Sequence, residues 1–236
     1  MKIISVICQK GGTGKTTLAL NIAVAAMEQG LAVAIIDLDP QPSACAWADL
    51  RAEKNNPPVI DAKPARLAAA IDTARTQGGI DLLIIDTGGR TEEGAFAAAK
   101  ASDLIILPLQ PSAIDLKSVP ATRDLIAIAG GAPVLSVLTR VKPFGTRHDE
   151  ARDWLAANKV PVSPISIGDR VTFQDAYASG MAVTEYDPSS RAAEEVMQLT
   201  DSVLRQLGIK TSGHADNHTC GDVDNGHQTT KSRRAR

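Results

Sequence analysis

The sequence Gln9-Lys10-Gly11-Gly12-Thr13-Gly14-Lys15-Thr16-Thr17 directly follows an apolar run at residues 2–8. A strand, a glycine-rich turn and a Gly-Lys-Thr that opens a helix are typical of a loop that binds nucleotide phosphates. The general pattern begins with glycine, where this chain has Gln9, and the chain adds a second lysine, Lys10. Two lysines in one loop concentrate positive charge that a triphosphate would compensate. The alternative is a glycine-rich turn that binds no ligand.

Each residue type in this loop has a predicted role. The glycines permit a tight turn whose N–H groups form a nest for an anion, and the following helix adds its positive end. Lys15 is expected to contact the β- and γ-phosphates, Thr16 to bind Mg²⁺ through its hydroxyl, and Thr17 to contact the α-phosphate. The predicted nucleotide-binding residues of the loop are Lys10, Gly11, Gly12, Thr13, Gly14, Lys15, Thr16 and Thr17.

Two further apolar runs end in a carboxylate. Residues 31–37 end in Asp37, and residues 82–86 end in Asp86. Because ligands bind at the carboxyl ends of parallel strands, we expect Gln9, Asp37 and Asp86 to meet at one crevice. An acid at the end of a buried strand needs a partner, and Mg²⁺ or its bound water would serve. The alternative for each aspartate is that it caps the next helix.

The alternation of strand-like and helix-like runs predicts an α/β fold. We expect a single doubly wound, mostly parallel sheet with helices on both faces, formed by residues 1–207. The predicted strands are 2–8, 31–37, 81–86, 103–108, 133–140 and about 162–166, with a possible edge strand at 58–60. The predicted helices are 15–29, 43–54, 65–77, 91–101, 116–129, 146–158, 169–179 and 188–207.

Together these motifs resemble those of the deviant Walker ATPases, a class of P-loop NTPases that includes ParA and MinD. The resemblance rests on Lys10–Thr17, on Asp37-Leu-Asp39-Pro-Gln and on Ile-Ile-Asp86, and it covers roughly residues 1–207. Within this class the chain is most similar to short ParA-type plasmid or chromosome partition ATPases. The runs Asp103-Leu-Ile-Ile-Leu-Pro-Leu-Gln-Pro-Ser and Phe173-Gln-Asp-Ala-Tyr-Ala-Ser-Gly180 support that similarity.

The resemblance implies a function and a set of residue roles. It implies slow hydrolysis of ATP with Mg²⁺ by a homodimer that ATP bridges, that binds DNA non-specifically, and that a small ParB- or ParG-like centromere-binding protein stimulates. Lys10 would reach the nucleotide of the other subunit, and Lys10, Lys15 and Asp37 would be catalytic. Asp86 and Asp37 would contact the metal through water, beside Thr16. Thr139 and Arg140 lie where relatives bind adenine.

Other functions stay open at this stage. A MinD-like or orphan deviant Walker ATPase shares the motifs, although no basic amphipathic helix ends the chain as in MinD. A ligase like dethiobiotin synthetase uses the same loop to phosphorylate a small carboxylate. The Asp-x-Asp-Pro-Gln segment argues against it. A third possibility is an assembly protein that polymerises with ATP and catalyses little.

The predicted DNA contact has modest support from charge. The formal net charge is −2, which does not by itself indicate a nucleic-acid partner. Basic residues are numerous in the C-terminal half, and a dimer could gather some of them into one stripe. Arg170 is our tentative DNA contact, because it is predicted to open a helix after Gly168-Asp169. The alternative is that these charges are simply solvated.

The composition of the C-terminal residues and the spacing of the cysteines indicate where in the cell the protein works. Residues 208–236 are mostly polar and contain almost no large apolar side chains, which predicts a disordered tail. Three well-separated cysteines, Cys8, Cys45 and Cys220, indicate no disulfide framework. No apolar run is long enough to span a membrane, and no signal peptide precedes the first strand. We therefore expect a cytoplasmic, nucleoid-associated protein without a membrane partner.

Overall fold

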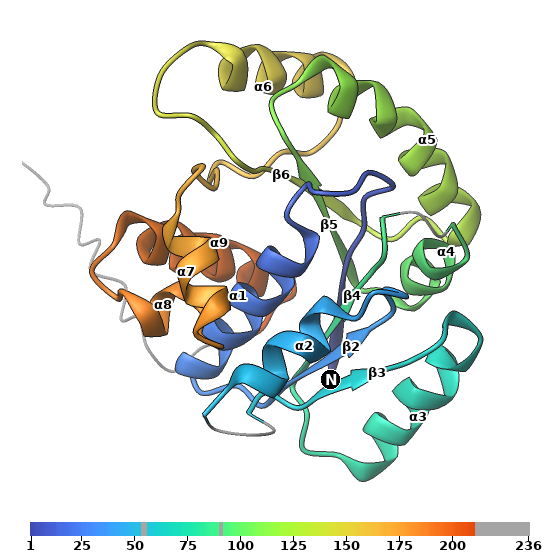
Figure 1. Cartoon of the computed structure of the whole chain (residues 1–236). Coiled ribbons are helices and arrows are strands. Elements are labelled where there is room, and N and C mark those ends of the chain that lie inside the picture. Colours follow the sequence, from blue (N-terminus) through green and yellow to red (C-terminus); the bar gives the residue numbers. More distant parts are fainter. Residues whose placement is uncertain (53–55, 90–91, 211–236) are drawn as a thin grey trace, which may run out of the picture.

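The computed structural model describes residues 1–52, 56–89 and 92–210. They form a parallel sheet of six strands in the order β3-β2-β4-β1-β5-β6, with helices on both faces (Figure 1). Because β1 lies between β4 and β5, the chain winds first to one side of β1 and then to the other, as predicted. The strands are β1 (Lys2–Val6), β2 (Val33–Asp37), β3 (Val59–Asp61), β4 (Leu82–Asp86), β5 (Leu104–Leu109) and β6 (Val134–Leu138).

The helices form one layer on each face of the sheet. The first layer, whose side chains share one core, holds α1 (Lys15–Glu28), α2 (Ser43–Leu50), α7 (Thr172–Ala178), α8 (Val183–Tyr186) and α9 (Arg191–Gln206). The opposite layer holds the 3₁₀ turn η1 (Pro64–Arg66), α3 (Leu67–Gln77), α4 (Glu92–Ala101) and α5 (Ala113–Ala129). A further helix, α6 (Arg147–Ala157), packs beside the end of β6 (Figure 1).

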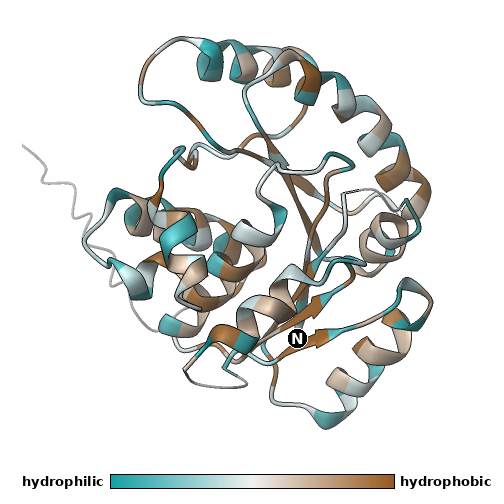
Figure 2. Ribbon diagram, viewed as in Figure 1, coloured by the Kyte–Doolittle hydropathy of each residue, from teal (hydrophilic) through white to brown (hydrophobic). Residues whose placement is uncertain are grey.

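The strands are buried on both faces, which explains their unbroken apolar runs. In β1, Ile4 and Val6 join the core under α1, whereas Ile3 joins the core under α3, α4 and α5. Hydrophobic residues colour the strands, most clearly β2 and β3, while hydrophobic and polar residues alternate along the helices (Figure 2). With few aromatic residues available, aliphatic and alanine side chains fill both cores.

Several predicted boundaries are wrong. Residues 162–166 form no strand, and within this segment Val162 makes an isolated bridge to Ser136 of β6. Pro161 and Pro164 lack the N–H groups that a ladder needs. The helix predicted at 169–179 begins at Thr172, the helix at 116–129 begins earlier, at Ala113, and the helix at 188–207 is α9, preceded by the unpredicted α8.

Other predictions concern the edges of the described region. The predicted edge strand at 58–60 is present as β3. Helix α2 ends at Leu50, and residues 53 and 54 of the helix predicted at 43–54 lie outside the described residues. The predicted tail also lies outside them from residue 211 onward, although Ile209 still packs against the core. Among the described residues, no helix is both long and apolar enough to cross a membrane.

Candidate nucleotide site

The strand ends converge as the sequence predicts. In the parallel registers Asp37 of β2 lies beside Asp86 of β4, and Asp86 lies beside Val6 of β1. Neighbouring strands are about 4.8 Å apart. The two carboxylates therefore lie at the same edge of the sheet as the loop that follows β1, at the point where the winding direction reverses.

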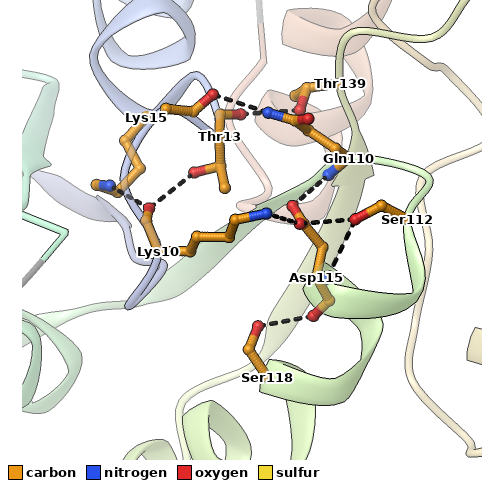
Figure 3. Close-up of polar contacts among 9 residues, drawn as sticks. Lys10, Thr13, Lys15, Gln110, Ser112, Asp115, Ser118 and Thr139 are labelled. Carbon is orange, nitrogen blue, oxygen red and sulfur yellow. Dashed lines mark hydrogen bonds and ion pairs between the residues drawn. The ribbon is translucent and has the colours of Figure 1, made fainter.

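The loop after β1 is held by side chains from two other strand ends. Gly14 has a φ of 92°, a left-handed conformation that glycine adopts without strain, and helix α1 starts at the next residue. The hydroxyl of Thr139 donates to the carbonyl oxygen of Thr13 over 2.8 Å, and the Gln110 amide donates to that of Gly12 over 2.9 Å (Figure 3). These two bonds anchor the loop to the ends of β5 and β6.

A cavity of about 670 Å³ lies over the loop and the start of α1. Lys15 is 7% exposed, and its ammonium donates to the carbonyl oxygen of Lys10 over 3.0 Å (Figure 3). The walls carry glycine N–H groups, a lysine and hydroxyls, the donors that bind phosphate. The lining residues are Gly11, Gly12, Gly14, Lys15, Thr16, Thr17, Asp39, Pro40, Gln41, Ser43, Gly88, Gly89 and Arg140.

The turn after β4 closes one side of this cavity. A methyl group built on Gly89 would lie 3.0 Å from the backbone nitrogen of Gly11 and 3.0 Å from the ammonium of Lys15. Contacts that short are rare for a real β-carbon, so a larger residue here would have to displace the Gly11 backbone or the Lys15 side chain. The turn after Asp86 and the loop after β1 therefore lie close together.

Asp86 and Thr16 form the candidate metal site. The hydroxyl of Thr16 donates to Oδ2 of Asp86 over 2.6 Å, and Oδ1 of Asp86 is buried without a hydrogen-bond partner among the described residues. Burial raises the pKa of Asp86 to about 7, with a further increase from Asp37 and opposing contributions from Thr16 and Lys15. A hydroxyl beside an unsatisfied carboxylate oxygen fits Mg²⁺, which takes oxygen ligands and keeps several waters.

Replacing Asp86 by asparagine is expected to stabilise the protein in the absence of Mg²⁺. Because the folded pKa of Asp86 is about 7 and the model value is 3.8, the folded state holds a proton that the unfolded state loses between these values. Stability should therefore fall as the pH rises from about 4 to about 7. Asp86→Asn removes this pH-dependent loss. The free energy of unfolding should therefore rise by about 1–3 kcal/mol above pH 7, since one pKa unit corresponds to about 1.4 kcal/mol.

Thermal melts of both proteins from pH 5 to pH 8, with a chelator present, measure this difference. The gain should shrink toward pH 5. Equal gains at both ends of the range would show that the effect does not come from the charge of Asp86. Asp61→Asn, at the exposed end of β3, is the control and should leave the pH dependence unchanged.

Asp37 is fully buried, and three backbone N–H groups donate to it. Its Oδ1 accepts from Asp39 over 3.0 Å, and its Oδ2 accepts from Ala44 and Cys45 over 2.8 and 3.3 Å. Asp37 therefore caps the start of α2, which is the alternative left open by the sequence. Burial raises the pKa of Asp37, and these N–H groups oppose the increase. A carboxylate has about four acceptor positions, so these three bonds leave one position of Oδ1 unused.

Lys10 lies within its own subunit in an ion pair with Asp115 (Figure 3). The carboxylate of Asp115 is fully buried and also accepts from the Gln110 backbone N–H over 2.9 Å and from the Ser112 hydroxyl over 2.8 Å. The Lys10 side chain is 37% exposed. To reach a second subunit, Lys10 must leave Asp115, which keeps its two other donors.

A second cavity of about 240 Å³ adjoins the first. It includes the two residues predicted to contact adenine, Thr139 and Arg140, although the Thr139 hydroxyl is already bonded to the phosphate loop. The walls combine apolar and aromatic groups with a few polar ones, the pattern of a small-molecule site. The lining residues are Gly14, Thr17, Leu18, Thr139, Arg140, Ile167, Gly168, Asp169, Arg170, Phe173, Gln174 and Tyr177.

Arg170, our tentative DNA contact, lines this second cavity. Its guanidinium pairs with Glu195 of α9, with Nη2 and Oε1 2.6 Å apart, and the side chain is 31% exposed. The helix that Arg170 was predicted to open starts later, at Thr172. Its side chain thus braces the segment before α7 against α9, and its contact with DNA stays a prediction.

Sequence reasoning missed two residues that hold the phosphate loop and its second lysine, Gln110 and Asp115. Asp115 could have been found, because Ser112-x-x-Asp115 has the spacing of a helix N-terminus, and the Ser112 hydroxyl accepts from the Asp115 N–H over 3.2 Å. Nothing in the sequence connects Gln110 with Gly12, because the contact joins segments 98 residues apart.

Comparison with known proteins agrees with this geometry. Residues 4–183 match the family described as the CobQ/CobB/MinD/ParA nucleotide binding domain. The chain belongs to this family. Its phosphate loop, Asp37, Asp86 and both cavity walls up to Tyr177 lie inside the matched range. The family is one of nucleotide-binding proteins. The candidate site for a nucleotide in this chain is the one at the carboxyl edge of the sheet.

Relatives within the CobQ/CobB/MinD/ParA family have different cellular tasks. The chain is 31% identical over 240 residues to the chromosome-partitioning ATPase Soj of Thermus thermophilus, covering 84% of this chain and 94% of Soj. It is 29% identical over 196 residues to the maintenance of carboxysome distribution protein A of Gloeobacter kilaueensis, covering 82% of this chain and 89% of that protein.

The fold is also that of a solved family member. The septum site-determining protein MinD of Pyrococcus horikoshii, in complex with Mg-ADP, superposes with a TM-score of 0.73 at 22% identity. The match covers 89% of this chain and 99% of MinD. The α/β fold with one parallel sheet is therefore shared, whereas the identity is too low to transfer a task.

Proposed function

We propose that this protein is a slow, partner-stimulated ATPase that partitions DNA. ATP bridges two subunits, the dimer binds DNA without sequence preference, and a small ParB- or ParG-like centromere-binding protein triggers hydrolysis to ADP and phosphate, which releases the DNA. The observation that supports this most is that Lys15 and Thr16 line the larger cavity, with the buried carboxylate of Asp86 hydrogen-bonded to Thr16 and an additional lysine, Lys10, in the same loop.

The residues divide the chemistry of phosphoryl transfer among them. The N–H groups of residues 11–17 and the start of α1 hold the phosphates, and Lys15 supplies charge at the β- and γ-phosphates. Thr16 would hold Mg²⁺ through its hydroxyl, and Asp86 and Asp37 would act on the metal through water. When bound, Mg²⁺ neutralises the charge that develops on the transferred phosphoryl group.

Asp37 is the candidate for positioning the attacking water. Its free acceptor position on Oδ1 receives a hydrogen from that water, while the N–H groups of α2 keep the carboxylate fixed. The same N–H groups favour the ionised carboxylate, which is the form that accepts a proton. Catalysis in this scheme comes from positioning and charge rather than from covalent intermediates.

Lys10 makes the activity depend on dimerisation. In the single subunit it is paired with Asp115, so it offers little charge to the bound phosphates. In a two-fold dimer, each Lys10 contacts the γ-phosphate held by the other subunit, an isologous arrangement in which each subunit completes its partner's site. Hydrolysis then requires two nucleotide-bound subunits.

Two other functions use the same site and predict different results. A small-molecule ligase is compatible with a family that includes CobQ and CobB. It would hydrolyse ATP only with an acceptor carboxylate and would ignore DNA. A carboxysome- or division-positioning ATPase, as in the relatives, would share the ATP-dependent dimer and differ in the partner protein.

ATP-dependent DNA binding is the test of the proposed function. Fluorescence anisotropy of labelled duplexes of unrelated sequence should show binding with ATP and Mg²⁺ and little binding with ADP. Affinity should fall roughly 10²-fold or more between 50 and 200 mM salt, because the lysines and arginines release counterions from phosphates. ATP hydrolysis should rise when DNA is added.

The tentative contact at Arg170 is tested in the same assay. Arg170→Ala should weaken binding to all sequences alike, and its affinity for ATP must be measured in parallel because the side chain lines the second cavity. Absence of DNA binding by the wild-type protein with ATP at low salt would contradict the partition function and favour the ligase or a relative that uses another surface.

A further inference from the structure

Tyr177 connects the second cavity with the segment that carries Asp37. Its ring lies in the wall of the second cavity, on α7. Its hydroxyl donates to the carbonyl oxygen of Ser43 over 2.8 Å. Ser43 is the first residue of α2 and lines the first cavity. One side chain therefore spans the boundary between the two cavities.

The contact leads directly to the candidate catalytic carboxylate. The two residues after Ser43 are Ala44 and Cys45, whose N–H groups donate to Oδ2 of Asp37 over 2.8 and 3.3 Å. The Ser43 carbonyl and the Ala44 N–H belong to one planar peptide unit, so the Tyr177 hydroxyl fixes the peptide that supplies the first of these donors to Asp37. Burial, followed by the charges of Asp37 and Asp86, raises the pKa of Tyr177, so the phenol stays protonated and donates at neutral pH.

The rest of α2 is anchored to the same part of the chain. The Trp47 indole N–H donates to the carbonyl oxygen of Met181 over 3.2 Å, and Arg51 donates to that of Gly180 over 3.0 Å. These contacts fix the middle and the end of α2. The bond from Tyr177 is at the start of the helix, beside Asp37. A small displacement of the backbone there changes the position of the Asp37 carboxylate.

We propose that Tyr177 is a positioning residue that couples nucleoside binding in the second cavity to the placement of Asp37. The inference rests on the proposed ATPase function. A base and ribose seated in the second cavity pack against the ring and restrict its motion, which fixes the Ser43 peptide and, through Ala44 and Cys45, the carboxylate. A ligand that consists of phosphates alone occupies only the first cavity, and it does not pack against the Tyr177 ring.

The substitution Tyr177→Phe keeps the ring and removes the hydroxyl. The KM for ATP should change less than about 2-fold, because the ring still lines the cavity. The kcat should fall about 3- to 10-fold, because one neutral hydrogen bond contributes about 0.5–1.5 kcal/mol and its loss here misplaces a catalytic group. Tyr186→Phe, the same change at the exposed tyrosine of α8, should leave both constants unchanged.

Hydrogen exchange of residues 38–47 gives a readout that does not depend on activity. In the wild-type protein, the non-hydrolysable analogue AMPPNP should slow exchange of this segment more than inorganic tripolyphosphate does, both with Mg²⁺. In Tyr177→Phe the two ligands should protect equally. The coupling would be overturned if Tyr177→Phe kept the wild-type kcat and if AMPPNP still slowed exchange of residues 38–47 more than tripolyphosphate does. A wild-type protein that does not hydrolyse ATP would instead overturn the proposed function, while the exchange result still decides the coupling.

Discussion

The substitution Lys15→Ala is expected to abolish ATP binding while leaving the fold intact. The ammonium of Lys15 lies in the wall of the larger cavity, 3.0 Å from the carbonyl oxygen of Lys10, and little of the side chain is exposed. Removing one charge from a buried charge pair costs about 2–5 kcal/mol. The dissociation constant for ATP should therefore rise by about two to three orders of magnitude.

Titration with a fluorescent ATP analogue measures this effect, and circular dichroism checks the fold. The matched control is Lys100→Ala on the exposed side of α4, which removes the same charge far from the cavity and should bind ATP normally. An affinity for ATP close to that of the wild type in Lys15→Ala would contradict the prediction that this loop binds the phosphates.

The substitution Lys10→Ala should separate ATP binding from hydrolysis. Each subunit should still bind ATP, because Lys15 and the loop N–H groups remain. Dimerisation on ATP should be lost, and hydrolysis should fall about 10²-fold or more, since losing one donor to the transition-state charge has an effect of that size. Size-exclusion chromatography with light scattering, with and without ATP, measures the first effect, and phosphate release measures the second.

The ion pair with Asp115 requires its own control, because Lys10→Ala leaves a buried carboxylate with fewer donors. Asp115→Asn removes the charge of the partner and keeps Lys10. It should dimerise on ATP at least as well as the wild type, since Lys10 no longer has to leave a carboxylate. A Lys10→Ala protein that dimerises and hydrolyses ATP normally would show that Lys10 only stabilises its own loop.

The parallel sheet was predictable because burial on both faces leaves a simple signal in the sequence. Runs such as 82–86 are apolar at every position, and each is followed by a helix-like segment. The strand predicted at 162–166 is absent because two prolines, one in this segment and one directly before it, lack backbone N–H donors. Its apolar residues Val162 and Ile165 each follow a proline, Pro161 and Pro164, and an apolar composition alone does not supply the donors that a strand needs.

The candidate site was predictable only where one short motif contains all its members. The loop from Lys10 to Thr17 carries its own spacing, and the strand-terminal acids follow from the topology. The contacts of Thr139 with Thr13, of Lys10 with Asp115 and of Tyr177 with Ser43 join segments more than a hundred residues apart. No periodicity or spacing encodes such pairs, because they depend on how the strand order and the helix layers fold together.

The absence of a side chain at Gly89 has a mechanical consequence. The turn after β4 and the phosphate loop are already so close that a single methyl group would overlap both the Gly11 backbone and the Lys15 ammonium. A β-carbon at this position would have to displace the Gly11 backbone or the Lys15 ammonium, so a larger residue in the turn after β4 would disturb the phosphate loop after β1. The spacing between the two loops therefore depends on the size of a single residue that follows a different strand.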